Sequence, residues 1–369
     1  WDGGWLEECI TAARQTEVNK RQAAYWKQIA ATFRDYGRHL LFASANEPAV
    51  QDPYGTAFGE DRMAILNSYH QTFIDAVRAT GGNNASRTLI VQGPRADIEL
   101  THKIMTTMPK DNIAERLMAE VHFYPYQFTL MENDESWGKV FYYWGKNNHS
   151  TTDTERNPTW GEESFVDSVF NLMKKQFVDK NIPVILGEFG AVKRTTLTGE
   201  VLKRHLASRC AFYNYVVSSA LSKGIIPAAW DAGGKGNLTM TIFDRKTGAV
   251  YDQDLLNAIR SAGLSNVQEW KAATINQINN SAMLSSNPFR ANTFMTSAAN
   301  GKLIVSFPGI AAGAAYVTVK SLLGKTLLSR SINGSTGHTS ITIPIEYRGL
   351  MILQIQQGSR CFTGKVINR

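Results

Sequence analysis

The chain has 369 residues, of which 43% are hydrophobic, and it carries a formal net charge of +7. A chain of this length can bury a large core and exceeds the usual size of one domain. No apolar run reaches the roughly eighteen residues of a membrane-spanning helix, so we expect no membrane span. The cysteines Cys9, Cys210 and Cys361 are far apart and odd in number, which indicates neither a disulfide framework nor a zinc site.

The charge is distributed unevenly along the chain. Residues 264–369 hold ten Lys or Arg and two Glu, a net charge of +8, whereas the residues before them have a net charge of −1. These basic residues are scattered singly through a β-rich sequence and form neither a basic run nor a helical stripe. We therefore expect no nucleic-acid partner.

Strand and helix patterns alternate along the first 263 residues. Strand patterns begin at Leu40 and recur at residues 88–92, 117–123, 183–186 and 224–229. Helix patterns cover residues 17–36, 64–79, 162–179, 199–222 and 253–262, and a hairpin pattern covers residues 239–251. This alternation predicts βα repeats and a parallel sheet, whose five strands are too few to close an eight-stranded barrel.

Two of these strand patterns end in a glutamate. The first runs into Asn46-Glu47-Pro48 and the second into Gly187-Glu188. Proline cannot continue a strand ladder and glycine lets the backbone turn, so both strands are expected to stop where their carboxylates emerge. A single such glutamate is often only a solvated loop residue. Two of them at one rim of an α/β barrel are the minimum equipment for hydrolysing a glycosidic bond.

Four strand ends resemble, in order and spacing, strands four, six, seven and eight of glycoside hydrolase family 5. They are Asn46-Glu47-Pro48, His122-Phe123-Tyr124, Gly187-Glu188-Phe189-Gly190 and Trp230. The opening Trp1-Asp2-Gly3-Gly4-Trp5-Leu6 is similar to the loop after strand three in the endoglucanase and xyloglucanase branch. The resemblance covers about residues 1–262 and implies an α/β fold, the (β/α)8 TIM barrel of retaining β-glycanases, here lacking strands one to three. We accordingly expect an N-terminally incomplete barrel that is poorly active alone, with Trp1 near the catalytic rim.

The same resemblance implies a role for each site residue. Glu47 is expected to be the acid/base and Glu188 the nucleophile, which a hydroxyl donor such as Tyr124 would keep ionised. Asn46 is expected to bind a sugar 2-hydroxyl, and His122 to orient the acid/base region. Alternatively, His122 and Tyr124, two apart on a strand, are only an inward pair with satisfied hydrogen bonds. No metal ion and no cofactor are expected.

Aromatic residues supply the expected substrate contacts. Trp230, followed by the glycine-rich Asp231-Ala232-Gly233-Gly234, is expected to be the sugar platform at the cleavage site. The long loop after His122 carries seven large rings, and disorder fits poorly with so many of them. We expect Trp137 and Trp144 of this loop, together with Trp5, to bind substrate. The alternative is that at least half of the loop's rings only pack it onto the barrel.

The pattern changes near residue 264. Residues 264–290 are rich in Asn, Gln and Ser and are predicted to be a linker with a short helical piece around Trp270. Residues 291–369 contain strand patterns at 302–307, 315–319, 341–343 and 350–355, which predict a small all-β sandwich. Pro344 indicates a short or edge strand. This part is similar to the basic C-terminal β modules of secreted bacterial cellulases, so a sorting or accessory role is expected.

The sequence therefore predicts a retaining endo-β-1,4-glucanase that acts on cellulose-like, mixed-linkage or xyloglucan glucans. Two alternatives stay open, namely a non-catalytic glycan-binding or surface protein on a degraded barrel, and a β-mannanase. We expect a monomer whose partner is a polysaccharide. The expected location is outside the cell or on its surface, although residues 1–5 lack the basic and apolar regions of a signal peptide.

Overall fold

The computed structural model divides the chain into two compact units, Trp1–Asn276 and Gln277–Arg369. It describes residues 4–52 and 57–265 of the first unit. In the second it describes residues 295–299, 302–307, 313–321, 326–334, 339–344, 349–357 and 360–368. Trp1 and nearly all of the predicted linker, including Trp270, lie outside the described residues.

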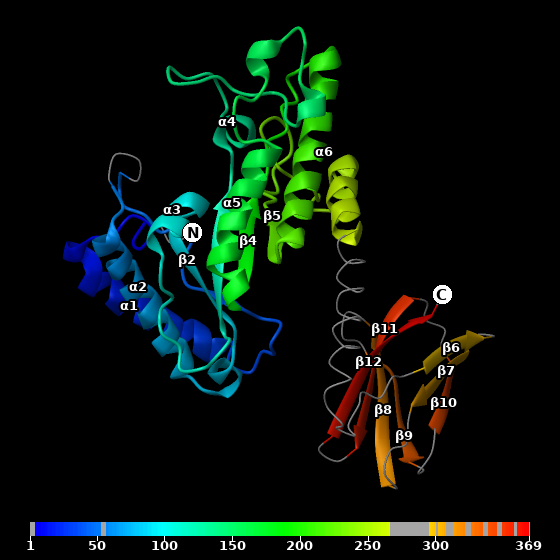
Figure 1. The fold of residues 1–369 in the computed structure, drawn as a ribbon. Coiled ribbons are helices and arrows are strands. Elements are labelled where there is room, and N and C mark those ends of the chain that lie inside the picture. The colour runs from blue at the N-terminus through cyan, green and yellow to red at the C-terminus, as the bar shows by residue number, and fades with distance from the viewer. Residues whose placement is uncertain are drawn as a thin grey trace. The chain divides into compact units, whose positions relative to one another are not determined.

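The first unit is built on a parallel sheet (Figure 1). Within the described residues it contains five strands, in the order β1 (Phe42–Ala43), β2 (Leu89–Asp97), β3 (Leu117–Phe123), β4 (Val184–Phe189) and β5 (Ile225–Ala229). Every neighbouring pair is parallel, so all five carboxyl ends meet at one edge. The predicted parallel α/β sheet is confirmed.

Helices precede, connect and follow these strands. The α-helices are α1 (Ala12–Thr32), α2 (Glu60–Arg78), α3 (Ile98–Ile104), α4 (Tyr126–Thr129), α5 (Glu163–Gln176) and α6 (Gly199–Ser222), with a further helix over residues 253–265. In Figure 1, α1 and α2 lie side by side, as do α5 and α6. The sequence did not predict α3, whose start is capped by Asp97 accepting from the Leu100 N–H at 2.7 Å. The predicted hairpin is reduced to one bridge, between Phe243 and Val250.

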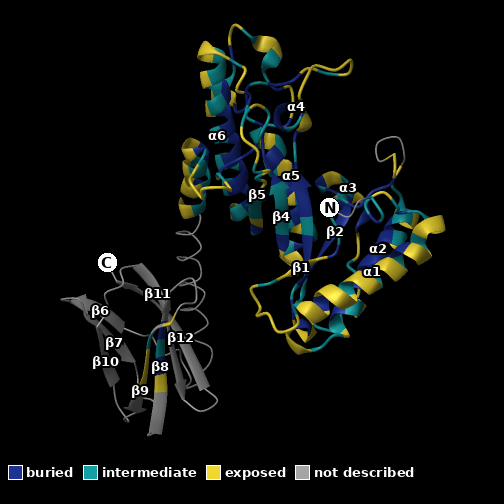
Figure 2. Ribbon diagram, turned by 180° about the vertical axis from the view of Figure 1, so that it is seen from behind, coloured by how far each residue is buried: buried dark blue, intermediate teal, exposed yellow. Residues whose placement is uncertain are grey.

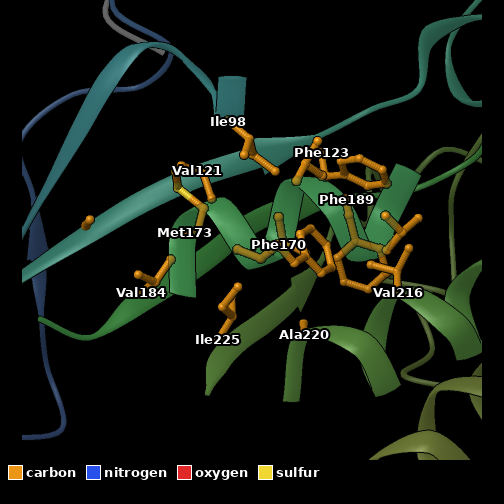
Figure 3. Packing of buried hydrophobic residues seen from close by; sticks show 14 of the residues in the cluster. Ile98, Val121, Phe123, Phe170, Met173, Val184, Phe189, Val216, Ala220 and Ile225 are labelled. Carbon is orange, nitrogen blue, oxygen red and sulfur yellow. The ribbon is translucent and has the colours of Figure 1, made fainter. Parts of the chain in front are cut away.

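The core lies between the central strands and the helices that cover them. Figure 2 shows β2 and β4 largely buried, whereas α1 and α2 expose one side. In Figure 3, Phe170 and Met173 of α5 project among the strand residues Val121, Val184 and Phe189. All five side chains are fully buried. The helices thus cover one face of β4 completely, while the residues between the buried ones are only partly buried.

Arg87, just before β2, anchors the loop that leads into β1. Its side chain is 2% exposed and its five N–H donors are all used. Four of them bind main-chain carbonyls of the segment from Phe33 to Leu40, and the fifth binds Oδ1 of Asn84. The guanidinium also lies 4.7 Å from the ring centroid of Phe42 in β1. One side chain thus fixes the approach to β1, the strand that precedes Glu47.

The second unit contains two antiparallel sheets within its described residues. One has the order β10 (Thr339–Pro344), β7 (Lys302–Phe307), β6 (Met295–Ala299). The other has the order β12 (Arg360–Asn368), β11 (Gly349–Gln357), β8 (Gly313–Ser321), β9 (Thr326–Gly334). Val317 and Val319 are buried while Tyr316 is exposed, the alternation of a strand with one covered face.

Pro344 ends β10, which is an edge strand as predicted. The sequence did not predict β6, β9 or β12. Among the described residues, no helix combines the length and the apolar character that crossing a membrane requires.

We predict that Arg87→Ala destabilises the first unit by about 3 kcal/mol, because it removes the five hydrogen bonds of a buried guanidinium. The midpoint of urea unfolding should fall, and amide exchange should accelerate most between Phe33 and Leu40. The control is Arg38→Ala, which removes the same charge from an exposed position in that segment. Equal effects of the two substitutions would contradict the anchoring role.

Candidate active site

Glu47 and Glu188 converge at the carboxyl edge of the sheet. Glu47 follows β1, and Glu188 lies near the end of β4, which β2 and β3 separate from β1 in the sheet. A side-chain oxygen of each lies within 4.8 Å of one of the other. Their side chains are 41% and 16% exposed, so Glu47 is the more accessible of the two. The strand ends identified in the sequence do bring two carboxylates together.

His122, on β3, lies between the two glutamates. Its Nδ1 is 2.7 Å from Oε1 of Glu47 and 3.7 Å from Oε2 of Glu188. Its Nε2 is 3.4 Å from Oε1 of a third carboxylate, Glu120. Burial lowers the pKa of His122, but hydrogen bonds to Glu120 and Glu47 and the nearby negative charges outweigh it and raise the pKa to about 9. The imidazole is therefore positively charged at neutral pH.

Tyr124 holds the second glutamate from the same face of β3. Its hydroxyl donates to Oε2 of Glu188 at 2.9 Å, the contact expected from the sequence. Burial raises the pKa of Tyr124 well above its ordinary value, so the hydroxyl remains a donor. Burial also raises the pKa of Glu188, while the charge of His122 and the Tyr124 hydrogen bond oppose that rise. The positive charge and the hydrogen bond both favour the ionised form of Glu188 and counter the effect of burial.

The backbone of Glu47 is held in an uncommon conformation. Its φ is +45°, a left-handed value that costs a non-glycine residue of the order of 1 kcal/mol. The main-chain N–H of Glu47 donates to Oε1 of Gln92 at 2.7 Å, and Gln92 is 2% exposed. A buried neighbour on β2 thus fixes the direction in which the Glu47 side chain leaves the strand.

Gln92 is itself held by His70 of α2. Nε2 of His70 donates to the Gln92 carbonyl at 2.8 Å, so Nδ1 must accept, from the Ser44 hydroxyl at 2.8 Å. His70 is fully buried, and burial lowers its pKa to about 4, which keeps the ring neutral. Ser44 lies three residues before Glu47, so the hydrogen bonds through His70 also hold the segment between β1 and Glu47 in place.

A cavity of about 930 Å³ opens beside Glu47, and Glu188 is not among the residues that line it. Glu47, His122 and Tyr124 line one part of it, and Tyr126 and Trp137 line another. The last two rings are 45% and 63% exposed, with centroids 5.9 Å apart. Exposed aromatic faces beside a polar, charged floor suit a ligand that is apolar on its faces and hydroxylated at its edges.

Three other predicted site residues, Asn46, Trp230 and Trp5, are not among the residues that line this cavity. Trp230 follows β5, is 45% exposed, and donates its main-chain N–H to the Phe189 carbonyl at 2.9 Å. The side-chain amide of Asn46 donates to Oε1 of Glu7 at 3.4 Å. Trp5 packs edge-on against Tyr25 of α1, with ring centroids 5.5 Å apart, and is not among the residues that line the cavity.

The prediction for Trp144 was wrong. Its side chain is 1% exposed, packs against Phe212 and Tyr215 of α6, and donates from Nε1 to the Gly161 carbonyl. A ring so enclosed has no face on which a sugar can stack. Trp144 instead packs the long loop onto α6, the alternative left open for part of this loop.

Glu47, His122 and Glu188 are close enough to hold a cation. An imidazole with a carboxylate at each ring nitrogen donates from both of them, so it offers no lone pair to a metal. The arrangement is instead that of two carboxylates, Glu47 being more exposed than Glu188, with the His122 charge and the Tyr124 hydroxyl beside them.

Comparison with known proteins identifies relatives of this chain. The model of Cellulase (glycosyl hydrolase family 5) matches residues 2–236. A xyloglucan-specific endo-β-1,4-glucanase of Bacteroides ovatus is 38% identical over 266 residues, 70% of this chain and 49% of that protein. Endoglucanase A of Paenibacillus barcinonensis is 30% identical over 272 residues, 70% of this chain and 63% of that protein.

The fold comparison agrees with the sequence comparison. The structure of a Bacteroides ovatus family 5 xyloglucanase in complex with a XXXG heptasaccharide matches with a TM-score of 0.65 and 36% identity. The match covers 71% of this chain and 54% of that one. The chain therefore spans about half the length of these two matches.

The five parallel strands with their helices correspond to part of the (β/α)8 barrel. The carboxylate pair at their carboxyl ends lies where barrel enzymes carry their active sites. The family match over residues 2–236 includes Glu47, His122 and Glu188. The chain belongs to glycosyl hydrolase family 5.

Proposed function

We propose that the protein is a retaining endo-β-1,4-glucanase that hydrolyses β-glucans, with xyloglucan as its substrate. The observation that carries the proposal is the approach of Glu47 and Glu188 to within 4.8 Å between side-chain oxygens. Retaining glycosidases hold their carboxyl groups about 5–5.5 Å apart, whereas inverting ones leave about 6.5–9.5 Å for a water molecule. The short separation favours direct attack by one carboxylate on the sugar.

The environments of the two carboxylates divide the work between them. Glu188 is partly buried, accepts from Tyr124 and lies near the charge of His122, which suits a nucleophile that must stay ionised. Glu47 is more accessible and faces the cavity, which suits an acid that must reach a departing sugar oxygen. In the first step Glu188 attacks the anomeric carbon while Glu47 protonates the leaving oxygen. In the second step, Glu47 takes a proton from a water molecule whose oxygen attacks the anomeric carbon. This attack breaks the bond between the sugar and Glu188.

The choice of xyloglucan rests on the relatives. Two of the similar proteins are named as a xyloglucan-specific glucanase and a xyloglucanase bound to a XXXG heptasaccharide. The wide cavity, with Tyr126 and Trp137 on one side, can admit a chain that carries side branches. Because a polymeric glucan does not enter cells, the proposed site of action is the cell surface or the medium.

We predict that the two glutamates respond differently to substitution. Glu188→Ala should abolish hydrolysis of every glucan, because no nucleophile remains. Glu47→Ala should lower hydrolysis of polysaccharide by about 10²- to 10⁴-fold, yet spare aryl glycosides whose leaving groups need no proton. Initial rates on xyloglucan and on a dinitrophenyl cellobioside measure the difference. Glu99→Ala, at an exposed position on α3, is the control. Equal losses on both substrates would show that the roles are misassigned.

We also predict that Trp137 binds the glucan without taking part in the chemistry. Trp137→Ala should weaken binding of xyloglucan oligosaccharides about tenfold, the loss of one stacking contact, in calorimetric titrations that require no turnover. Trp160→Ala is the matched control, because Trp160 is also exposed but does not line the cavity. Equal affinities of the Trp137 variant and the unmodified protein would contradict the proposed cleft.

A further inference from the structure

Glu120 is a largely enclosed carboxylate to which the sequence analysis assigned no role. It lies on β3, two residues before His122 and therefore on the same face of that strand. Its side chain is 13% exposed, and its Oε1 is 3.4 Å from Nε2 of His122. Burial of an acidic residue is costly unless a partner compensates it, and His122 is the partner that the structure provides.

The neighbouring strand leaves a space for this carboxylate. A Cβ atom built on Gly187 of β4 would lie 1.9 Å from Oε1 of Glu120 and 2.7 Å from its Cδ. Any residue with a side chain at position 187 would therefore displace the Glu120 carboxylate. Gly187 directly precedes Glu188, so the end of β4 both positions that glutamate and leaves space for the Glu120 side chain.

The charges around His122 require it to carry two protons. Glu120 lies at Nε2, Glu47 at Nδ1, and Glu188 3.7 Å from Nδ1. An ionised carboxylate accepts hydrogen bonds but donates none, and a carboxylic acid protonated on one oxygen still accepts at the other, so each ring nitrogen facing such an oxygen must bear hydrogen. Two other groups complete the surroundings: Tyr124, whose hydroxyl binds Glu188, and Asp97, aligned with His122 on β2, whose carboxylate caps α3.

We propose that Glu120 is a positioning residue of the proposed hydrolase, acting through His122. By holding Nε2–H, it keeps the imidazole charged and its Nδ1–H directed at Oε1 of Glu47. Proton transfer to the leaving group then falls to Oε2 of Glu47, and the positive charge reduces repulsion between Glu47 and Glu188. The role in hydrolysis rests on the proposed function, whereas the effect of Glu120 on His122 can be measured without any substrate.

The test follows the ring nitrogens of His122 by ¹⁵N NMR as a function of pH. The chain has seven histidines, and the His122 signal is assigned from its absence in His122→Gln. We expect His122 to titrate near 9 in the unmodified protein. In Glu120→Gln, which keeps the shape but removes the charge, its titration should move down by about one pH unit or more. Glu120→Asp should restore part of the shift.

Two controls separate this effect from general damage. Buried His205 lies on α6 and binds the Tyr142 carbonyl, with a pKa lowered to about 4 by burial, and its titration should not change. Glu115→Gln removes the same charge from an exposed position just before β3 and should leave His122 unaltered. Gly187→Ala, which displaces the Glu120 carboxylate, should lower the His122 titration as Glu120→Gln does.

Hydrolysis supplies the second readout. Glu120→Gln should lower kcat on xyloglucan about tenfold with little change in KM, while hydrolysis of dinitrophenyl cellobioside is nearly unchanged. A His122 titration that is equal in Glu120→Gln and the unmodified protein would overturn the proposal, even if hydrolysis proceeds. A displaced titration in a protein that never hydrolyses glucan would instead refute the proposed function and leave the link between Glu120 and His122 in place.

Discussion

The hydrogen bond between His122 and Glu47 is the interaction on which the site depends. It joins residues 75 positions apart in the sequence, at 2.7 Å, and it spans the ends of β3 and β1. The parallel sheet makes this contact possible, because all its strands end at one edge. Without the imidazolium, three carboxylates would face one another in a partly buried space, an arrangement in which at least one would hold a proton.

The rest of the first unit holds that contact in place from several sides. Gln92 binds the main chain of Glu47, and His70 and Ser44 support Gln92 and the end of β1. Arg87 fixes the loop that enters β1. The second carboxylate has its own support in Tyr124. This division places the two glutamates in different surroundings, the condition under which one pair of identical side chains can supply both a nucleophile and an acid.

Much of the fold and the centre of the site could be predicted from the sequence. Glu47 and Glu188 were identifiable because each follows an apolar run that stops at proline or glycine. Trp144 was mistaken because a ring's presence in a loop says nothing about its burial. Glu120 had a signal that was overlooked, a charged residue two positions before His122 inside an apolar strand. Gln92 and His70 had no such signal in the sequence, because their contacts depend on how β2 and α2 pack.

The strands β6, β9 and β12 were missed because polar and small residues interrupt their apolar pattern.

The central claim, attack by Glu188 on the sugar, is tested most directly by trapping the covalent intermediate. In a 2-deoxy-2-fluoro cellobioside with a dinitrophenyl leaving group, the fluorine slows both the formation and the hydrolysis of the intermediate. The reactive leaving group speeds its formation alone, so the intermediate accumulates. Mass spectrometry of a proteolytic digest should find the added sugar on the peptide that contains Glu188. Labelling of Glu47 or of another residue, or hydrolysis with no labelled peptide at all, would contradict the account.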